Sequence, residues 1–355
     1  MLPKHECDTV FFGPMIGELG WACSRWHAYA RFRRFSEFNH CKSIAADYDW
    51  RYPLYKDYIN EFIPLPTWFT DLKLEQDCYE AVPPNAPPGS MTPPDVYGAL
   101  IAHFQQYYNP QTTWTVRTPR GVNLFVQQAA KQMWIALKPS EESAGYVDSL
   151  LANNQRDVVV VSARGRARAA NRNVPEKVWN YVVDELAKSF TVVITGTMGG
   201  SLLTNKVGRN IINMIPITGP QGLDILIAWM NRAMFSVTSQ SGPTLISLLC
   251  ETPSYIIGHE GYRHTTAENW LKTPAMFREV PNGIYAALDP QQVWGDLVNF
   301  YHSIKHSNDQ IESAVHDCLF KDTNIMRRMM DPYENMIIYP INTQAVREAV
   351  LNEQK

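Results

Sequence analysis

The residues with the clearest chemical potential follow an apolar run, MFSVT, in the second half of the sequence. There the stretch SQSGPT supplies Ser241, Gly242, Pro243 and Thr244 where a helix is expected to begin. Free backbone N–H groups and hydroxyls at a helix start bind phosphate well. The alternative is that Ser241 or Thr244 only caps the helix, which is the commoner role of these residue types.

Two further apolar runs end in groups of the same kind. After DVVVVS, the loop ARGRARAANRN carries Arg164, Arg168 and Arg172, whose guanidinium groups can pair with phosphate oxygens. After FTVVIT, the stretch GTMGG begins with Gly196 and Thr197 and lets a ligand approach the backbone closely. Three neighbouring strand ends with such residues favour a nucleotide-diphosphate site over a solvated basic loop.

Other features narrow the type of ligand. No G-x-G-x-x-G follows a strand and no Walker lysine motif is present, which argues against a dinucleotide oxidoreductase and a P-loop enzyme. A D-x-D sequence, Asp47-Tyr48-Asp49, lies in the first half, where a donor-bound metal is not expected. We therefore expect arginines and helix N–H groups, and no metal ion, to neutralise the diphosphate. Gln240 follows the MFSVT run and His259 follows a further apolar run, SYIIG. Both are candidates to contact the nucleoside or sugar, although a polar surface loop explains His259 equally well.

The first half contains one carboxylate in an unusual setting, Glu18 in FFGPMIGELGW. Gly17 and Gly20 permit a tight turn around it, and Trp21 and Trp26 offer apolar walls that would raise its pKa toward that of a general base. The alternative is a glutamate in the first turn of a helix, stabilised there by the helix dipole.

The residues after this turn allow two further interpretations. His27 is a second candidate base because imidazole titrates near neutrality, and it is equally consistent with a partly buried structural residue. Basic and aromatic side chains also interleave in a pattern that suits nucleic acid: Arg25, Arg31, Arg33 and Arg34 with Trp21, Trp26 and Tyr29. The net charge of −3 argues against DNA, because affinity for DNA comes mostly from phosphate neutralisation.

Composition describes a globular protein with room for two domains in 355 residues, 45% of them hydrophobic and 19% charged. Its six cysteines are scattered without ligand-like spacing, which predicts free thiols in a reducing compartment and no zinc site. With no signal-peptide core and no apolar run of membrane-spanning length, we expect a cytoplasmic protein without a membrane span.

The order of elements predicts the fold class. In the second half, buried strands are expected over 157–162, 190–195, 210–215, 234–238 and 254–258, with helices between them over 178–188, 222–231 and 243–249. In the first half, a strand over 9–12 precedes helical spacing over 18–35 and a second strand. Strands that alternate with helices over short connections predict a parallel sheet and a Rossmann-like domain.

At this point a family resemblance becomes specific. The segments Asn171–Trp179, Thr195–Gly196, Leu223–Ala233 and Gln240–Thr244 resemble the donor half of bacterial heptosyltransferase-type glycosyltransferases. The likeness covers residues 155–260 well and the opening loop more loosely. It departs from the family at Gln240, where an aspartate is usual, and at Leu245 or Ile246, where a histidine is common. The G-P-x-x-G-E-x-G-W start also resembles that of phage and bacterial sequences of this kind.

The resemblance implies an α/β fold of the GT-B type, in which two Rossmann-like domains with parallel sheets face a central cleft. It further implies that a carboxylate in the first loop acts as the base toward the acceptor hydroxyl. Glu18 matches that position, which places Gly17, Trp21 and Arg25 on the acceptor side.

We accordingly predict an acceptor-binding domain over 1–150, a nucleotide-sugar-binding domain over 151–305 and a helical extension over 306–355. The predicted activity is inverting, metal-independent transfer of a sugar from a nucleotide diphosphate, with no cofactor. The acceptor is a surface glycan or a hydroxymethylated DNA base. The alternatives are a DNA-modifying phage-type glycosyltransferase specifically, and a non-catalytic nucleotide-binding protein that keeps the fold.

Overall fold

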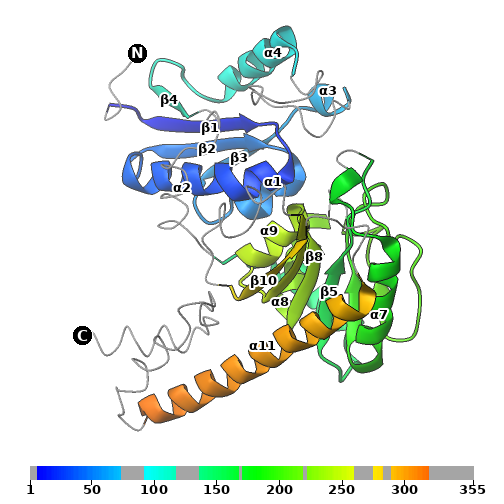
Figure 1. The fold of residues 1–355 in the computed structure, drawn as a ribbon. Helices are drawn as coiled ribbons and strands as arrows, with labels where there is room; N and C mark the ends of the chain where they lie inside the picture. Colours follow the sequence, from blue (N-terminus) through cyan, green and yellow to red (C-terminus); the bar gives the residue numbers. More distant parts are fainter. Residues whose placement is uncertain are drawn as a thin grey trace. The chain divides into compact units, whose positions relative to one another are not determined.

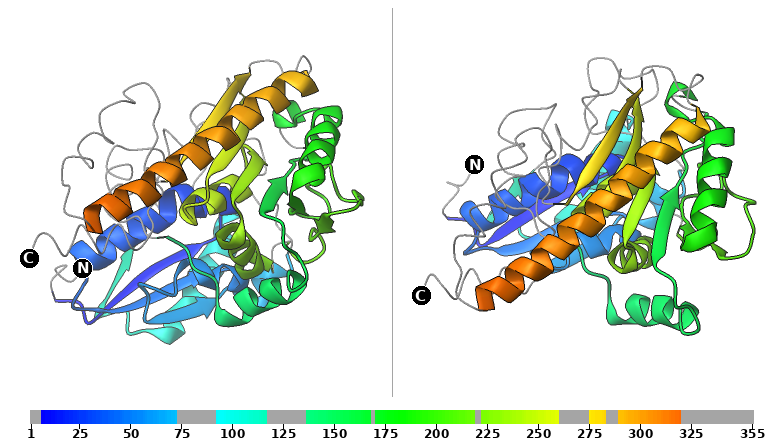
Figure 2. Two further views of the ribbon diagram at one scale, coloured as in Figure 1. Left: turned by 90° about the horizontal axis from the view of Figure 1, so that it is seen from below. Right: turned by 60° about the horizontal axis from the view of Figure 1, so that its bottom comes forward.

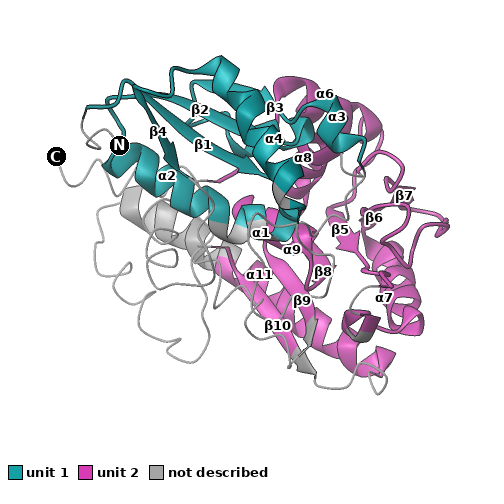
Figure 3. Ribbon diagram, turned by 90° about the horizontal axis from the view of Figure 1, so that it is seen from above, with its two compact units in different colours: residues 1–135, 268–272 teal, residues 136–267, 273–355 magenta. Residues whose placement is uncertain are grey.

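The computed structural model describes residues 6–72, 92–116, 136–167, 170–218, 222–259, 275–282 and 289–319 (Figure 1). The chain forms two compact units, which are drawn in different colours in Figure 3. Unit 1 comprises residues 1–135 and 268–272, and unit 2 comprises residues 136–267 and 273–355. Arg168 and residues 320–355 of the expected extension lie outside the described part.

Unit 1 is built on a four-stranded parallel sheet with the order β3-β2-β1-β4. The strands are β1 (Thr9–Met15), β2 (Lys42–Asp47), β3 (Glu61–Pro64) and β4 (Thr113–Val116). Because side chains alternate along a strand, neighbouring residues of β1 face opposite layers. Phe11 packs on Phe104 with ring centroids 5.5 Å apart, whereas Phe12 meets Trp26 edge-on at 6.5 Å. Both faces of this sheet are therefore covered.

Helical segments of unit 1 connect these strands. They are α1 (Leu19–Trp21), the π-helical η1 (Ala22–Trp26), α2 (His27–Ser36), the 3-10 helix η2 (Asp49–Leu54), α3 (Thr67–Thr70), α4 (Pro94–Phe104) and η3 (Gln105–Tyr107). The helical spacing predicted over 18–35 is confirmed, but a π turn interrupts the helix. Such turns are frequent at functional sites.

Unit 2 contains a six-stranded parallel sheet with the order β10-β9-β8-β5-β6-β7. Its strands are β5 (Val158–Ser162), β6 (Thr191–Ile194), β7 (Ile211–Asn213), β8 (Phe235–Ser239), β9 (Ser254–His259) and β10 (Phe277–Asn282). All five strands predicted from the sequence are present, and β10 is an edge strand that the prediction missed. Parallel strands alternating with helices confirm the predicted α/β class.

The described helical segments of unit 2 are α6 (Glu141–Leu150), the 3-10 helix η4 (Ala170–Arg172), α7 (Glu176–Ser189), α8 (Leu223–Arg232), α9 (Gly242–Leu249) and α11 (Pro290–Leu319). One face of the sheet is covered by α7 and α11 (Figure 2). A buried stripe on α11 recurs at helical spacing and joins the same core as α7: Val293, Leu297, Phe300 and Ile304. Among the described helices, none is both long and apolar enough to cross a membrane.

Helix α6 belongs to unit 2 because its first turn is bound to α8. Ser140 caps α6 by accepting a hydrogen bond from the Ser143 N–H at 3.2 Å, and its own N–H donates to Asp224 at 3.0 Å. Helix α6 and the residues from Ala136 onward accordingly fall in unit 2.

The glycine that the opening motif depends on structurally is Gly13. It has a φ of +117°, and an added Cβ would lie 2.7 Å from the Ala46 carbonyl oxygen of β2. Gly20, which was expected to permit a turn, instead lies within α1.

We therefore expect Gly13→Ala to lower the free energy of unfolding by roughly 2 kcal/mol or more, because both the backbone angle and the contact with β2 are unfavourable. The matched control is Gly98→Ala in α4, where an added Cβ meets nothing within 4 Å. That control should stabilise the helix by about 0.5–1 kcal/mol. Urea unfolding followed by tryptophan fluorescence measures both, and equal stability of Gly13→Ala and wild type would contradict the packing described here.

Candidate functional site

Each sheet contains a switch point, where the strand order reverses. In unit 1 the chain moves from β1 outward to β2 and β3 and then crosses to β4 on the other side of β1. In unit 2 it moves from β5 to β6 and β7 and then crosses to β8, on the other side of β5. Ligands of open α/β sheets bind at the carboxyl ends of the strands beside such a point. Glu18 follows β1, and the loops carrying Arg164 and Ser241 follow β5 and β8.

Glu18 lies between the end of β1 and the start of α1. Its backbone is extended, its carbonyl oxygen accepts a hydrogen bond from Ala22 N–H at 3.0 Å, and its side chain makes no capping hydrogen bond. Among the described residues, nothing forms a hydrogen bond or ion pair with its half-buried carboxylate. Glu18 therefore lies at the N-cap of α1 without capping it through its side chain, a position that fits both the proposed base and the alternative of a glutamate stabilised by the helix dipole.

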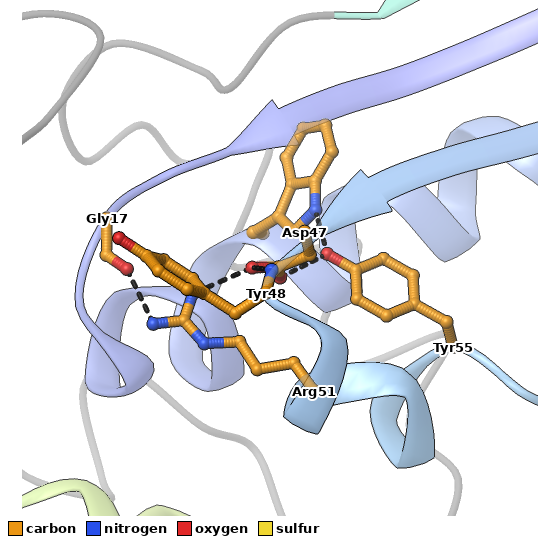
Figure 4. A network of polar contacts seen from close by, with 6 residues as sticks. Gly17, Asp47, Tyr48, Arg51 and Tyr55 are labelled. Atoms are coloured by element: carbon orange, nitrogen blue, oxygen red, sulfur yellow. Dashed lines mark hydrogen bonds and ion pairs between the residues drawn. The ribbon is translucent and has the colours of Figure 1, made fainter. Parts of the chain in front are cut away.

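A buried polar network fixes the loop that carries Glu18 (Figure 4). Arg51 donates from Nη2 to the Gly17 carbonyl oxygen at 2.7 Å and from Nη1 to Asp47 Oδ1 at 3.1 Å. Asp47 is the last residue of β2, and it also accepts hydrogen bonds from Tyr48 N–H and Tyr55 O–H, each at 2.7 Å. Because these donors occupy the Asp47 oxygens, the D-x-D sequence is part of an ion pair and does not present two free carboxylates.

Burial has a measurable electrostatic consequence in this network. Asp47 is fully buried, and removal from water raises its pKa to about 6, even though Arg51 and the hydrogen bonds from Tyr55 and Tyr48 act in the opposite direction. The Arg51 guanidinium lies over the rings of Tyr48 and Trp50, 4.8 and 4.7 Å from their centroids. It thereby gains cation–π contacts inside the unit.

Sequence reasoning missed this network, although a signal was present. Asp47, Arg51 and Tyr55 are spaced at i, i+4 and i+8, a pattern typical of one face of an α-helix, although here Asp47 ends β2 and Arg51 lies in the 3-10 helix η2. Trp26, expected as an apolar wall beside Glu18, is fully buried and donates its indole N–H to Tyr55 Oη at 2.8 Å.

His27 lies in the core of unit 1. Its Nδ1 is 3.0 Å from the Tyr58 hydroxyl, and its ring packs on Tyr55 with centroids 4.6 Å apart. Burial lowers its pKa well below the usual value, and the positive charges of Arg31 and Arg51 lower it further. The imidazole is therefore neutral at physiological pH, and this placement favours the structural interpretation of His27 over a second base.

The arginines that suggested nucleic acid are engaged within unit 1. Arg31 is buried and pairs with Asp57, and Arg33 pairs with Glu37 at 2.7 Å. Arg34 donates to the Phe38 carbonyl oxygen at 2.6 Å. The backbones of Trp21 and Arg25 lie in α1 and η1, and their side chains are outside the described part.

In unit 2, Ser239 at the end of β8 connects the two loops of the switch point. Its hydroxyl accepts a hydrogen bond from Arg164 N–H at 3.0 Å. Its carbonyl oxygen accepts from the hydroxyls of Ser241, at 3.1 Å, and Thr244. Ser241 and Thr244 are thus turned back toward the strand and do not cap α9, so the capping interpretation is wrong for both side chains.

The positive end of α9 is consequently left without a side-chain cap. The helix begins at Gly242, Pro243 occupies its first turn, and Ser241 at the N-cap is extended with a φ of −159°. Backbone N–H groups and the helix dipole at such an end attract anions.

Two predicted arginines border this end. Arg172 donates to the Gln240 carbonyl oxygen, and Arg164, which is buried, donates to Asn173 Oδ1. Gln240 is itself oriented by Glu279 of β10, with 2.5 Å between Nε2 and Oε1. Asn173 was not singled out from the sequence, and it also bonds both backbone groups of Arg166.

The remaining predicted donor residues follow neighbouring strands. Gly196 is the second residue after β6 and has a φ of +146°, and its N–H donates to Thr218 Oγ1 at 3.3 Å. Thr197 begins a turn closed by the Gly200 N–H, which donates to its carbonyl oxygen at 3.0 Å. His259 is the last residue of β9, and its side chain lies outside the described part.

The raised pKa of Asp47 predicts an unusual pH dependence. Because the native carboxyl binds its proton more tightly than the unfolded one, its contribution to stability is largest near pH 4 and falls as the pH rises toward 6. The decline amounts to roughly 3 kcal/mol, at about 1.4 kcal/mol per pKa unit. Asp47→Asn has no titrating carboxyl at this position and therefore lacks this pH-dependent contribution to stability.

The stability advantage of wild type over Asp47→Asn should therefore shrink between about pH 4 and pH 7, as measured by urea unfolding at each pH. A gap that widens with rising pH would place the native pKa of Asp47 below its unfolded value and contradict the assignment.

Comparison with known proteins identifies the fold. No family model and no curated protein sequence matches this chain. Among solved structures it is similar to a family 9 glycosyltransferase from Veillonella parvula (TM-score 0.57, 11% identity, covering 84% of this chain and 98% of that one). It is also similar to the E. coli ADP-heptose lipopolysaccharide heptosyltransferase II (TM-score 0.53, 13% identity, 84% and 99%). A third similar structure is E. coli heptosyltransferase WaaC with ADP (TM-score 0.51, 10% identity, 82% and 99%). The chain therefore has the GT-B fold of these glycosyltransferases, with two Rossmann-like units built on parallel sheets.

Proposed function

We propose that this protein transfers a sugar from a nucleotide-diphosphate donor to a hydroxyl acceptor, with inversion at the anomeric carbon. The observation that supports this most strongly is the convergence of anion-attracting groups on the β5–β8 switch point, in a fold shared with family 9 glycosyltransferases. Binding at this position is the general behaviour of open α/β sheets.

In the proposed donor site, the diphosphate lies against the uncapped end of α9. The Gly242 N–H and the dipole of α9 would stabilise the negative charge that develops as the phosphate leaves, and Arg164, Arg168 and Arg172 would add positive charge. Charge neutralisation by these groups needs no divalent ion at the donor.

The nucleoside and sugar would contact residues that follow adjacent strands. We assign this role to Gly196, Thr197, Gln240 and His259, of which Gly196 offers close approach to the backbone. The similar structures include an ADP-heptose heptosyltransferase and a heptosyltransferase with ADP, so an ADP-sugar is the first donor to test.

Glu18 is the proposed base. The acceptor oxygen would attack the anomeric carbon as the bond from that carbon to the phosphate oxygen breaks, and the hydroxyl proton would pass to Glu18. Arg51 supports this role indirectly, because its hydrogen bond to the Gly17 carbonyl fixes the residue before Glu18. We place Gly17, Trp21 and Arg25 on the acceptor side.

We favour a saccharide as the acceptor. The alternative acceptor, a hydroxymethylated DNA base, was inferred from interleaved basic and aromatic residues. Of these, Arg31, Arg33 and Arg34 form ion pairs or hydrogen bonds inside unit 1. Salt-sensitive binding of duplex DNA to the full chain would favour the nucleic-acid acceptor instead.

The test of the proposed base is Glu18→Gln, which keeps the shape of the side chain and removes the proton acceptor. We expect kcat for release of nucleoside diphosphate from a nucleotide sugar to fall by about 100-fold or more, with little change in donor KM. The matched control is Glu61→Gln at the start of β3, at the other end of the same sheet.

Unchanged turnover in Glu18→Gln would show that the base lies elsewhere. A wild-type chain that binds nucleotide sugars but turns over none, with any saccharide or DNA acceptor, would favour the non-catalytic alternative.

A further inference from the structure

Three side chains of the type that bind transition metals meet at the amino end of the unit 1 sheet. Cys7 lies just before β1, and His40 and Cys41 lie just before β2. The two sulfur atoms are 3.0 Å apart, and the ligand atoms of all three residues lie within 4.8 Å of one another. Both cysteines are free thiols.

The backbone brings these residues together without help from a metal. Parallel pairing aligns Thr9 with Lys42, so the residues that precede the two strands are neighbours. Lys42 N–H donates to the Asp8 carbonyl oxygen at 2.9 Å, and the Cys41 thiol donates to the Cys7 carbonyl oxygen at 3.1 Å. The ligands are therefore preorganised by the sheet itself.

Exposure differs among the three residues in a way that suits a ligand site. Cys7 and Cys41 are each only 3% exposed, whereas His40 is exposed. Within the described part of the chain, no hydrogen bond involves the His40 ring. A cation can thus reach the thiols from the solvent side, where the imidazole stands.

We propose that Cys7, His40 and Cys41 form a binding site for a thiophilic divalent cation, with zinc as the expected ion. Two thiolates and one imidazole form a zinc donor set, and water can complete the tetrahedron. Binding replaces the thiol protons by the metal and releases them to solvent. The sulfurs would need to separate by less than about 1 Å to reach tetrahedral spacing at Zn–S bonds of about 2.3 Å.

The cation would serve the structure of unit 1 and take no part in the proposed transfer. Glu18 follows the carboxyl end of β1, whereas Cys7 precedes its amino end. Seven strand residues separate the two ends, which corresponds to about 20 Å at roughly 3.3 Å per residue. Metal binding there joins the starts of β1 and β2.

The proposed site departs from an expectation drawn from the sequence. The cysteines were interpreted as scattered free thiols without ligand spacing, because Cys7 and Cys41 are separated by 34 positions. The spacing rule describes ligands on one short segment, and here the parallel pairing of β1 and β2 supplies the proximity.

The test is a titration of the reduced, metal-stripped full chain with Co²⁺. We expect thiolate-to-cobalt charge-transfer absorption that saturates at one Co²⁺ per chain and is displaced by Zn²⁺. Cys7→Ser and Cys41→Ser should each abolish the charge-transfer bands of the site or reduce them strongly. His40→Asn should weaken Co²⁺ binding by more than about tenfold, which is the smallest loss typical of a ligand's supporting partner.

Two controls match these variants. Cys250→Ser removes a buried free thiol of unit 2, and His302→Asn removes an exposed imidazole of α11, so neither should change the titration. His40→Asn alters an exposed side chain and keeps the test valid if a cysteine variant does not fold. The proposal is overturned if reduced wild type gives no charge-transfer band, or if the cysteine variants give the same band. It is also overturned if the pair forms a disulfide under air and binds no metal after reduction. None of these readouts depends on glycosyl transfer.

Discussion

The buried ion pair between Asp47 and Arg51 is the constraint on which the β1–α1 loop of unit 1 depends. An arginine in a core needs a partner of opposite charge, because removal of one member of such a pair leaves an uncompensated charge and typically costs 3–5 kcal/mol. Asp47 provides the counter-charge from the end of β2. The Gly17 carbonyl provides a second acceptor, so the electrostatic needs of Arg51 determine where the β1–α1 loop lies.

In unit 2, neutral groups fix the loops at the switch point. Ser239, at the end of β8, binds the backbone of the loop after β5 through its hydroxyl and the start of α9 through its carbonyl. The hydroxyls of Ser241 and Thr244 donate to this strand end, and Ser241 at the N-cap of α9 makes no side-chain cap. In each unit, residues at a strand end fix a loop at a switch point, and the groups left unpaired there are the candidates for chemistry.

The sequence predicted those parts of the fold that depend on local pattern. Continuous β-branched runs such as DVVVVS and FTVVIT correspond to β5 and β6, whose side chains are buried on both faces. The strands that were missed are the edge strands β3, β4 and β10. The first two have only four residues each, and β10 contains Pro281, so their identity comes from pairing with a neighbour distant in sequence.

The candidate sites likewise contain residues that the sequence could predict and residues that it could not. Glu18 and the Ser241–Thr244 turn could be found because they follow recognisable apolar strands. The residues that fix the surrounding loops could not, since Asn173 bonds Arg164, Glu279 bonds Gln240 and Arg51 bonds the Gly17 carbonyl through tertiary packing. Cys7 and Cys41 are the clearest case, because the register of β1 on β2 brings together residues that their sequence spacing separates.

The central claim is that unit 2 holds a nucleotide diphosphate at the β5–β8 switch point. A thermal-shift screen against ADP-, UDP-, GDP- and CMP-sugars tests it directly, because a ligand that binds only the native state stabilises it by mass action. At 100 times its Kd this amounts to about 2.7 kcal/mol. We predict that at least one diphosphate sugar raises Tm by several degrees and that Arg172→Ala reduces this shift. No shift with any donor, or an equal shift in Arg172→Ala, would contradict the account.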